Sequence, residues 1–352
     1  MSPTPVASDR ALLRRLPKAE LHCHLDGSVR PATLLELASE YGVRMPADDA
    51  ESLAAYMRVD DARNLEDYLA RFAITLSVMQ TEAAMERCAY ELALDAADEG
   101  VRYLEMRYAP TLNTLAGLEP GAVLEASLRG VQRAERERDI TARVIVCSLR
   151  HYDPALSLEL AKLAVAYRDR GVVGFDLAGG EANNPASRHA AAFEWCREHG
   201  LACTCHAGEG DGPASVAQAV HACHAHRLGH ATRLIEDEAL LRAAHARGIA
   251  LGLCLTSNVQ TRGTDRYETH PLKQYLARGM NVCLNTDNRL MSGTTLVDEY
   301  HHAAVQCDCT FDELAGMALD GFRSAFLPEA EKAALIARMT AEIEALRAGE
   351  ER

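Results

Sequence analysis

The feature that most constrains this chain is a repeated alternation of two kinds of segment. Short apolar and β-branched runs predict buried strands, and each is followed by a longer stretch with helical spacing. The alternation continues until eight strands are expected, so we predict an α/β fold of the (β/α)8 TIM-barrel type. The expected strands span residues 19–24, 102–108, 142–148, 172–177, 202–206, 227–229, 249–255 and 281–285.

Other parts of the chain refine this prediction. An open doubly wound sheet is the alternative, but no glycine-rich dinucleotide motif follows an early strand. Residues 30–100, between the first two strands, must form several extra helices. Within this segment, residues 65–79 have apolar residues at helical spacing and either cover the barrel mouth or pack in the core. A C-terminal helix is expected over residues 329–348. Since no linker divides the chain, we expect one barrel domain over residues 1–352, with its core at about 12–348.

Composition excludes several classes of function. The net charge is −14, from 37 basic and 51 acidic residues, and no basic cluster offsets it, which argues against a nucleic-acid partner. The longest apolar runs fall well short of the roughly 20 residues that span a bilayer. Residues 1–15 have no apolar core of signal-peptide length. We therefore expect a cytoplasmic protein without a membrane partner, and the sequence assigns no oligomeric state.

The eleven cysteines are scattered through apolar stretches of a long chain. This pattern is typical of small buried hydrophobes rather than of a disulfide framework. The close pairs Cys203/Cys205 and Cys307/Cys309 lack a second pair at zinc-ribbon spacing, which disfavours a structural zinc site. Cys203 and Cys205 fit better as alternate residues of a strand.

Polar residues gather where the expected strands end, and in a barrel these ends meet at one mouth. His22 and His24 lie on the same face of the first strand, because side chains alternate along it. A single histidine there would indicate a surface or hydrogen-bonded residue, but two in register favour a metal. His206, His230 and Asp287 end later strands. Because imidazole and carboxylate groups suit zinc, these positions predict a catalytic metal site with a place left for water.

The other histidines and the known zinc motifs give no support for a second metal site. His221, His224 and His226 precede the sixth strand, where we expect solvent-facing or structural roles. The chain has no His-Glu-x-x-His motif and no Pro-Cys-x-x-Cys motif. A zinc ion bound by thiolates is therefore disfavoured.

Eight short segments along the chain form a pattern in order and spacing. The main ones are PKAELHCHLDGS at 17–28, HAGE at 206–209, RLGH at 227–230 and NTD at 285–287. Supporting segments are YLARF at 68–72, MRYAP at 106–110, DLAGGE at 176–181 and TSN at 256–258. Taken together, these segments closely resemble the adenosine deaminase family from about residue 12 to residue 330.

This resemblance implies a chemistry. It implies an amidohydrolase-type barrel that removes the 6-amino group of adenosine or 2′-deoxyadenosine, releasing ammonia. One Zn²⁺ per chain would lower the pKa of a bound water, and the resulting hydroxide would attack purine C6. Iron, cobalt or manganese can occupy the same kind of ligand set. The zinc ligands that the resemblance implies are His22, His24, His206 and Asp287.

The resemblance also implies roles for the surrounding residues. Glu209 would protonate purine N1, while His230 and Asp287 would position the hydroxide and stabilise developing charge. Gly179 would present its backbone N–H to purine N3, and Asp26 would accept a hydrogen bond from the ribose 5′-hydroxyl. The substrate-binding residues are thus His24, Asp26, Gly179 and Asn288.

One position departs from the commonest family pattern, because Asn288 stands where a second aspartate usually follows Asp287. An asparagine amide donates at every pH, so we expect Asn288 to keep the contact with purine N7. The rival substrates are free adenine and a nucleoside with a large 5′ group such as aminodeoxyfutalosine. Asp26 favours a free 5′-hydroxyl. A rival of another class is a barrel that binds a metal or ligand without catalysis.

Overall fold

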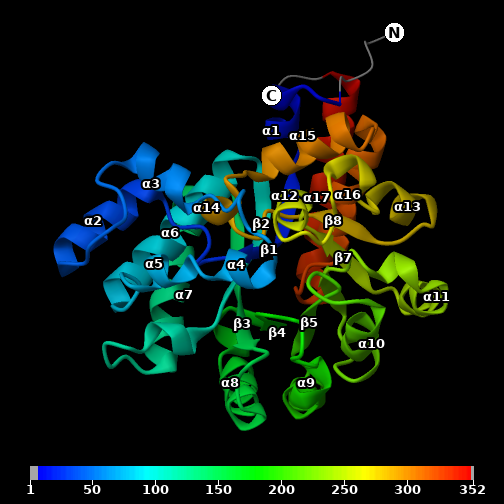
Figure 1. Ribbon diagram of the computed structural model, residues 1–352. Helices are drawn as coiled ribbons and strands as arrows, with labels where there is room; N and C mark the ends of the chain where they lie inside the picture. The colour runs from blue at the N-terminus through cyan, green and yellow to red at the C-terminus, as the bar shows by residue number, and fades with distance from the viewer. Residues whose placement is uncertain (1–6, 350–352) are drawn as a thin grey trace.

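The computed structural model describes residues 7–349 and places eight parallel strands in one barrel, in chain order (Figure 1). The barrel is closed between its first strand and the residues that follow its last: Asp287 N–H donates to His22 O over 2.9 Å, and Cys23 bridges to Asp287. The (β/α)8 prediction is therefore confirmed. The strands are β1 (Lys18–His24), β2 (Val101–Tyr108), β3 (Thr141–Leu149), β4 (Val172–Ala178), β5 (Ala202–Ala207), β6 (Arg227–His230), β7 (Ala250–Leu253) and β8 (Val282–Leu284).

The largest error in the predicted strands lies at the end of β7, and all other ends differ by at most one residue. Residues 249–255 were expected to be one strand, but β7 ends at Leu253 and Leu255 begins helix α12 (Leu255–Gln260). Apolar periodicity does not separate a buried strand from the buried first turn of a helix. The strand β8 is three residues long, so Asn285 lies beyond its end. At β6 the strand includes His230, one residue more than expected.

Helices follow the strands as the alternation predicts. Many begin at a side-chain cap or at a proline in the first turn: Asp153 accepts the Ala155 N–H and Pro154 opens α8. The helices that follow β2 to β8 are α7 (Pro120–Glu137), α8 (Pro154–Ala166), α9 (Ala190–Glu198), α10 (Pro213–His221), α11 (Glu238–Ala246), α12, α13 (Leu272–Ala277), α14 (Arg289–Ser292), α15 (Leu296–Gln306) and α16 (Phe311–Arg323).

The segment between β1 and β2 forms a group of helices on one side of the barrel, coloured blue to cyan in Figure 1. These are α2 (Pro31–Tyr41), α3 (Ala50–Met57), α4 (Leu65–Leu69), α5 (Phe72–Leu76) and α6 (Glu82–Asp98), preceded by α1 (Arg10–Arg15) before β1. The stretch 65–79 thus contains two short helices rather than one. Both helices line the main pocket of the barrel mouth.

The amino end of the barrel is closed by the last helices. The C-terminal helix α17 (Glu329–Ala348) has the predicted bounds. Its Met339 packs with Phe322 of α16 against Ala19 and Tyr103 at the start of β1 and β2. The candidate site residues lie at the opposite end of the barrel, at the carboxyl ends of the strands.

The cysteine predictions agree with the structure. All eleven cysteines are free and buried, and Cys203 and Cys205 lie on β5. Among residues 7–349, none of the helices is long and apolar enough to span a bilayer.

Candidate active site

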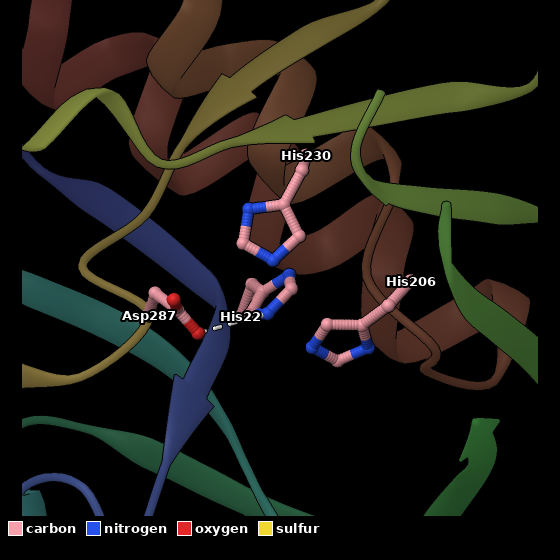
Figure 2. A group of neighbouring side chains, drawn as sticks. All are labelled: His22, His206, His230 and Asp287. Atoms are coloured by element: carbon pink, nitrogen blue, oxygen red, sulfur yellow. Dashed lines mark ion pairs between the residues drawn. The ribbon is translucent and has the colours of Figure 1, made fainter. Parts of the chain in front are cut away.

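Four buried side chains from separate strand ends converge in the barrel mouth, as Figure 2 shows. His22 comes from β1, His206 from β5, His230 from β6 and Asp287 from the turn after β8. Their potential ligand atoms all lie within 4.8 Å of one another. The distance from His22 Nε2 to Asp287 Oδ1 is 3.2 Å. This arrangement is a metal-binding cluster of three imidazoles and one carboxylate.

A fifth group, His24, lies beside this cluster. Its Nε2 is 3.0 Å from His206 Nε2 and 3.4 Å from Asp287 Oδ1. The structure therefore brings together all four residues of the ligand set that the sequence suggested. Either His24 or His230 could be the fourth ligand beside His22, His206 and Asp287. The hydrogen bonds of His230 help to decide between them.

The backbone is unusual where these side chains are placed. His230 has a φ of 63° and Asp287 has a φ of 60°. Such left-handed conformations are uncommon for residues other than glycine and cluster at functional sites. Gly229 has a different reason to lack a side chain, because a Cβ there would lie 2.6 Å from His22 Cε1. The sequence around β6 thus leaves room for the His22 ring.

Buried polar partners fix the orientation of His206 and Asp287. Asp176 on β4 lies 3.0 Å from His206 Nδ1 and is itself paired with buried Arg107 at 2.9 Å. Since a carboxylate accepts, His206 carries its proton on Nδ1 and presents a free Nε2 lone pair to the cluster. Ser257 donates to Asp287 Oδ2 over 2.7 Å.

A chain of hydrogen bonds assigns the proton of His230. The Leu272 N–H donates to His270 Nδ1, so neutral His270 donates from Nε2 to Asn258 Oδ1. The Asn258 amide then donates to His230 Nδ1 over 2.9 Å. Neutral His230 must therefore carry its proton on Nε2, which faces Glu209 Oε2 at 3.3 Å. A protonated nitrogen has no lone pair for a metal.

Burial keeps three of the imidazoles neutral. Burial lowers the pKa of His24 and of His230 to about 3, and it holds the pKa of His22 well below its ordinary value. Burial alone would raise the pKa of Asp287, but His230, His24 and His206 hold it below its ordinary value. Neutral imidazoles and an ionised carboxylate are the forms that bind a metal ion.

The residues present fit a metal ion. The His22 Nε2 atom is buried and has no hydrogen-bond partner among the described residues. Such an orphaned nitrogen is costly unless another group, for example a metal, occupies its lone pair. His24 and His206 bring two Nε2 atoms within 3.0 Å, and His206 Nε2 carries a lone pair. The donor set of nitrogen and oxygen atoms suits zinc.

Glu209 lies in the loop after β5 and faces the same space. It is buried, and its pKa is raised well above the usual range, first by burial and then by the charges of Asp287 and Glu181. Both effects favour the protonated form of this carboxyl, which is the form able to give up a proton.

A cavity of about 290 Å³ connects these groups with the other predicted contacts. Two surfaces line it. We call the strand-end residues the polar wall: His24, His206, Glu209, His230 and Asp287. We call the apolar lining residues from α4, α5 and the loop after β2 the apolar wall: Leu65, Leu69, Phe72, Leu76 and Leu112.

The predicted substrate contacts also line this cavity. Asp26 and Asn288 are buried, and each has an Oδ1 atom without a hydrogen-bond partner among residues 7–349. Burial raises the pKa of Asp26 to about 7. A Cβ on Gly27 would lie 1.9 Å from Asn288 Oδ1, so Gly27 makes room for that side chain. Gly179 has a φ of 89°, which glycine adopts readily.

Comparison with known proteins shows which family has this arrangement of residues. The family model described as adenosine deaminase matches residues 17–342. An adenosine deaminase of Mycobacterium avium is 38% identical over 346 residues, covering 92% of this chain and 94% of that relative. The chain belongs to the adenosine deaminase family. As a member of this family it is a hydrolase that acts on a carbon–nitrogen bond. A probable adenosine deaminase of Dictyostelium discoideum is 40% identical, but the chain spans 41% of that relative's length.

Solved structures of similar fold agree with the family assignment. Adenine deaminase from Arthrobacter aurescens superposes with a TM-score of 0.87 at 27% identity, covering 94% of this chain and 99% of that one. An amidohydrolase from Burkholderia ambifaria with bound Zn gives 0.86 at 26% identity, covering 98% and 95%.

In this deaminase-family barrel, the sequence did not predict the buried residues that hydrogen-bond to the cluster side chains or to the loop of Glu209. Asp176, Glu181, Ser257 and Asn258 lie in segments that match the family, but nothing local in the sequence indicates their partners. His270 gave no signal, because its role depends on a contact with α12. By contrast, the residues expected to play no part lie away from the site: His221, His224 and His226 are exposed before β6.

Proposed function

We propose that this chain is a zinc enzyme that deaminates adenosine and 2′-deoxyadenosine to inosine and 2′-deoxyinosine. One observation carries the proposal: the carboxyl of Glu209, whose protonated form is favoured by burial, lines the same cavity as a buried metal-binding cluster. A proton donor opposite an activated water is what hydrolysis at purine C6 requires.

The proposed zinc ligands are His22, His24, His206 and Asp287. We prefer His24 to His230 as the fourth ligand because the hydrogen-bond chain through Asn258 leaves His230 with a proton on Nε2. When bound, the metal ion supplies Lewis-acid activation of a water molecule.

The chain's own residues would handle the protons. Glu209 donates to purine N1, so that C6 becomes tetrahedral without a charge building on the ring. Asp287, which is ionised and held by Ser257, accepts a proton from the attacking water. His230 donates a hydrogen bond from Nε2 to the developing oxyanion, and it does so as a neutral group.

The substrate contacts favour a nucleoside. Asp26 would accept from the ribose 5′-hydroxyl, Gly179 N–H would reach purine N3 and the Asn288 amide would donate to N7. Among the described residues, no lysine or arginine lines the cavity, and Asp26 would disfavour a 5′-phosphate. A small-molecule purine nucleoside is therefore the proposed partner.

Two rival substrates remain of interest, free adenine and a 5′-substituted adenosine. The fold is similar to that of an adenine deaminase, but the buried carboxyl of Asp26, which lines the cavity, would have no ribose hydroxyl to bind on a free base. A substrate panel tests this: adenosine, 2′-deoxyadenosine, adenine and 5′-substituted nucleosides, with the ultraviolet change on deamination as the readout. We expect the highest kcat/KM for the two nucleosides. Faster conversion of a 5′-substituted nucleoside or of adenine would overturn the substrate assignment, and zinc-loaded protein inert toward every compound would indicate a non-catalytic barrel.

A further inference from the structure

One buried carboxylate outside the polar wall holds the loop that carries Glu209. Glu181, which follows β4, is buried and accepts hydrogen bonds from four consecutive backbone N–H groups. Its Oε1 accepts from Gly208 over 2.7 Å, and its Oε2 accepts from Glu209 over 2.9 Å, from Gly210 over 2.8 Å and from Asp211 over 3.1 Å.

Four donors are about the full acceptor capacity of one carboxylate. Successive N–H groups that converge on one point form a concavity that favours an anion. Here the anion is part of the protein rather than a ligand. Because the loop is held along four residues in a row, its backbone cannot shift without breaking several of these bonds at once.

Arg150 balances the charge of Glu181 and extends the connection. Its guanidinium lies 3.9 Å from Glu181 Oε1, and it donates to the carbonyl oxygens of His206 and Asn184 over 2.6 and 2.7 Å. Arg150 is fully buried and follows β3. The ends of β3, β4 and β5 are therefore tied together immediately behind the proton donor.

We propose that Glu181 is a positioning residue for catalysis, fixing the backbone at Glu209 so that its carboxyl meets purine N1. This inference rests on the proposed role of Glu209. Glu181 also lies two residues after Gly179, the proposed contact of purine N3. One short turn after β4 thus sets the N3 contact directly and the N1 contact through Glu181, which aligns the base with its proton donor.

The test compares Glu181→Gln and Glu181→Ala with the wild type. Glutamine keeps the volume but replaces one acceptor oxygen by an NH2 group that cannot accept, and alanine removes all four acceptor contacts. We expect kcat to fall between about tenfold and a hundredfold, with a larger fall for alanine, because a small displacement of a catalytic group has an effect of this order. Metal content and the Kd for inosine should change by less than about threefold.

A matched control is Glu91→Gln on α6, which also removes a buried carboxylate, one held by Thr33 and Arg87. Its kcat should stay within about twofold of wild type. Hydrogen–deuterium exchange gives a readout besides activity: the amides of residues 208–211 should exchange faster in both Glu181 variants and not in Glu91→Gln.

The outcomes separate the two proposals. Kinetics use whichever 6-aminopurine the wild type turns over best, so a wrong substrate leaves the Glu181 test intact. An unchanged kcat in Glu181→Gln, or a fall in kcat matched by equal losses of metal and inosine binding, would overturn the positioning role. If Glu181→Ala does not fold, Glu181→Gln decides alone, since it preserves the side-chain volume.

Discussion

The polar wall and the apolar wall line the same small cavity, but their side chains are held in place differently. In the polar wall, three of the five side chains have a buried polar partner: Asp176 for His206, Ser257 for Asp287 and Asn258 for His230. In the apolar wall, Leu65, Leu69, Phe72 and Leu76 come from two five-residue helices. Those groups of the first wall are oriented by directional bonds. The side chains of the second wall make apolar contacts, while their helices are anchored by hydrogen bonds such as that between Tyr68 and Ser292.

This difference indicates that the polar wall sets the geometry of the reaction and that the apolar wall contributes to substrate binding. Directional bonds hold atoms to the short distances that proton transfer and metal binding demand. Apolar packing contributes binding that is roughly proportional to area and does not depend on angle. Changes in the polar wall should therefore lower kcat or metal affinity, whereas changes in the apolar wall should raise KM.

The largest effect should come from Glu209→Gln. The amide keeps the shape of the side chain but is a far weaker acid, so we expect kcat to fall by about 10²- to 10⁴-fold. Zinc content, measured by atomic emission, should stay at the wild-type level because Glu209 is not a proposed ligand. Turnover equal to wild type would remove Glu209 from the proposed mechanism.

The next largest effect should be on the pH dependence of stability, through Glu299, which accepts a hydrogen bond from the first turn of α12. Glu299 on α15 accepts from Thr256 N–H and Thr294 Oγ1, and burial raises its pKa from 4.5 to about 7. Between these pH values the folded state binds more protons than the unfolded state, so stability falls as pH rises through that window. The linked free energy is at most about 3 kcal/mol.

Glu299→Gln should flatten this part of the profile. Denaturant melts of the zinc-loaded wild type and variant at pH 4.5 and pH 7 measure the difference, and other titrating groups cancel between them. The variant should gain stability relative to wild type as pH rises to 7. A parallel pair of profiles would contradict the raised pKa of Glu299.

A third effect should appear in metal affinity. Asp176→Asn weakens the partner that orients His206, and loss of such a partner typically lowers metal affinity about 10- to 100-fold. Competition with a chromophoric chelator measures the zinc Kd. The matched control is Glu105→Gln, because Glu105 is a buried carboxylate paired with Arg227 as Asp176 is with Arg107, but its other partners are Tyr103 and Phe326 rather than a proposed ligand. An equal loss of zinc affinity in both variants would mean that Asp176 acts only through stability.

The two walls also differ in how far the sequence predicted them. Strand alternation is a local pattern, so it gave the eight strands and placed His22, His24, His206 and Asp287 at one mouth. The partners behind them depend on contacts between distant segments. Ser257 and Asn258 lie on α12, which begins at Leu255, the last residue of the strand expected over 249–255. Their side chains bond to Asp287 and His230.

The apolar wall was only half predicted for a related reason. Helical periodicity in residues 65–79 indicates an apolar face, but periodicity does not say whether that face meets the core or a cavity. The structure answers this, since Leu65 and Phe72 line the pocket beside Asn288. Tertiary placement, rather than propensity, decides the role of such a segment.

A smaller effect should follow from Asn288→Ala, which removes the proposed donor to purine N7. Loss of one hydrogen bond of about 1 kcal/mol corresponds to a roughly fivefold to tenfold lower kcat/KM, with metal retained. The control is Asn281→Ala, which removes an amide bonded to Ser324 at the amino end of the barrel. Normal kinetics in Asn288→Ala would show that Asn288 does not contact the base.

The smallest effect should come from the apolar wall itself. Phe72 is half-buried, and Phe72→Ala removes part of the surface that the nucleoside would cover. We expect KM to rise by roughly fivefold, about 1 kcal/mol, with kcat within about twofold of wild type, since packing of this kind acts alike on the ground state and the transition state. Leu115→Ala is the control, because Leu115 is 85% exposed and does not line the pocket. A fall in kcat as large as the rise in KM would contradict the division between the walls, because it would place Phe72 among the groups that set the geometry of the reaction.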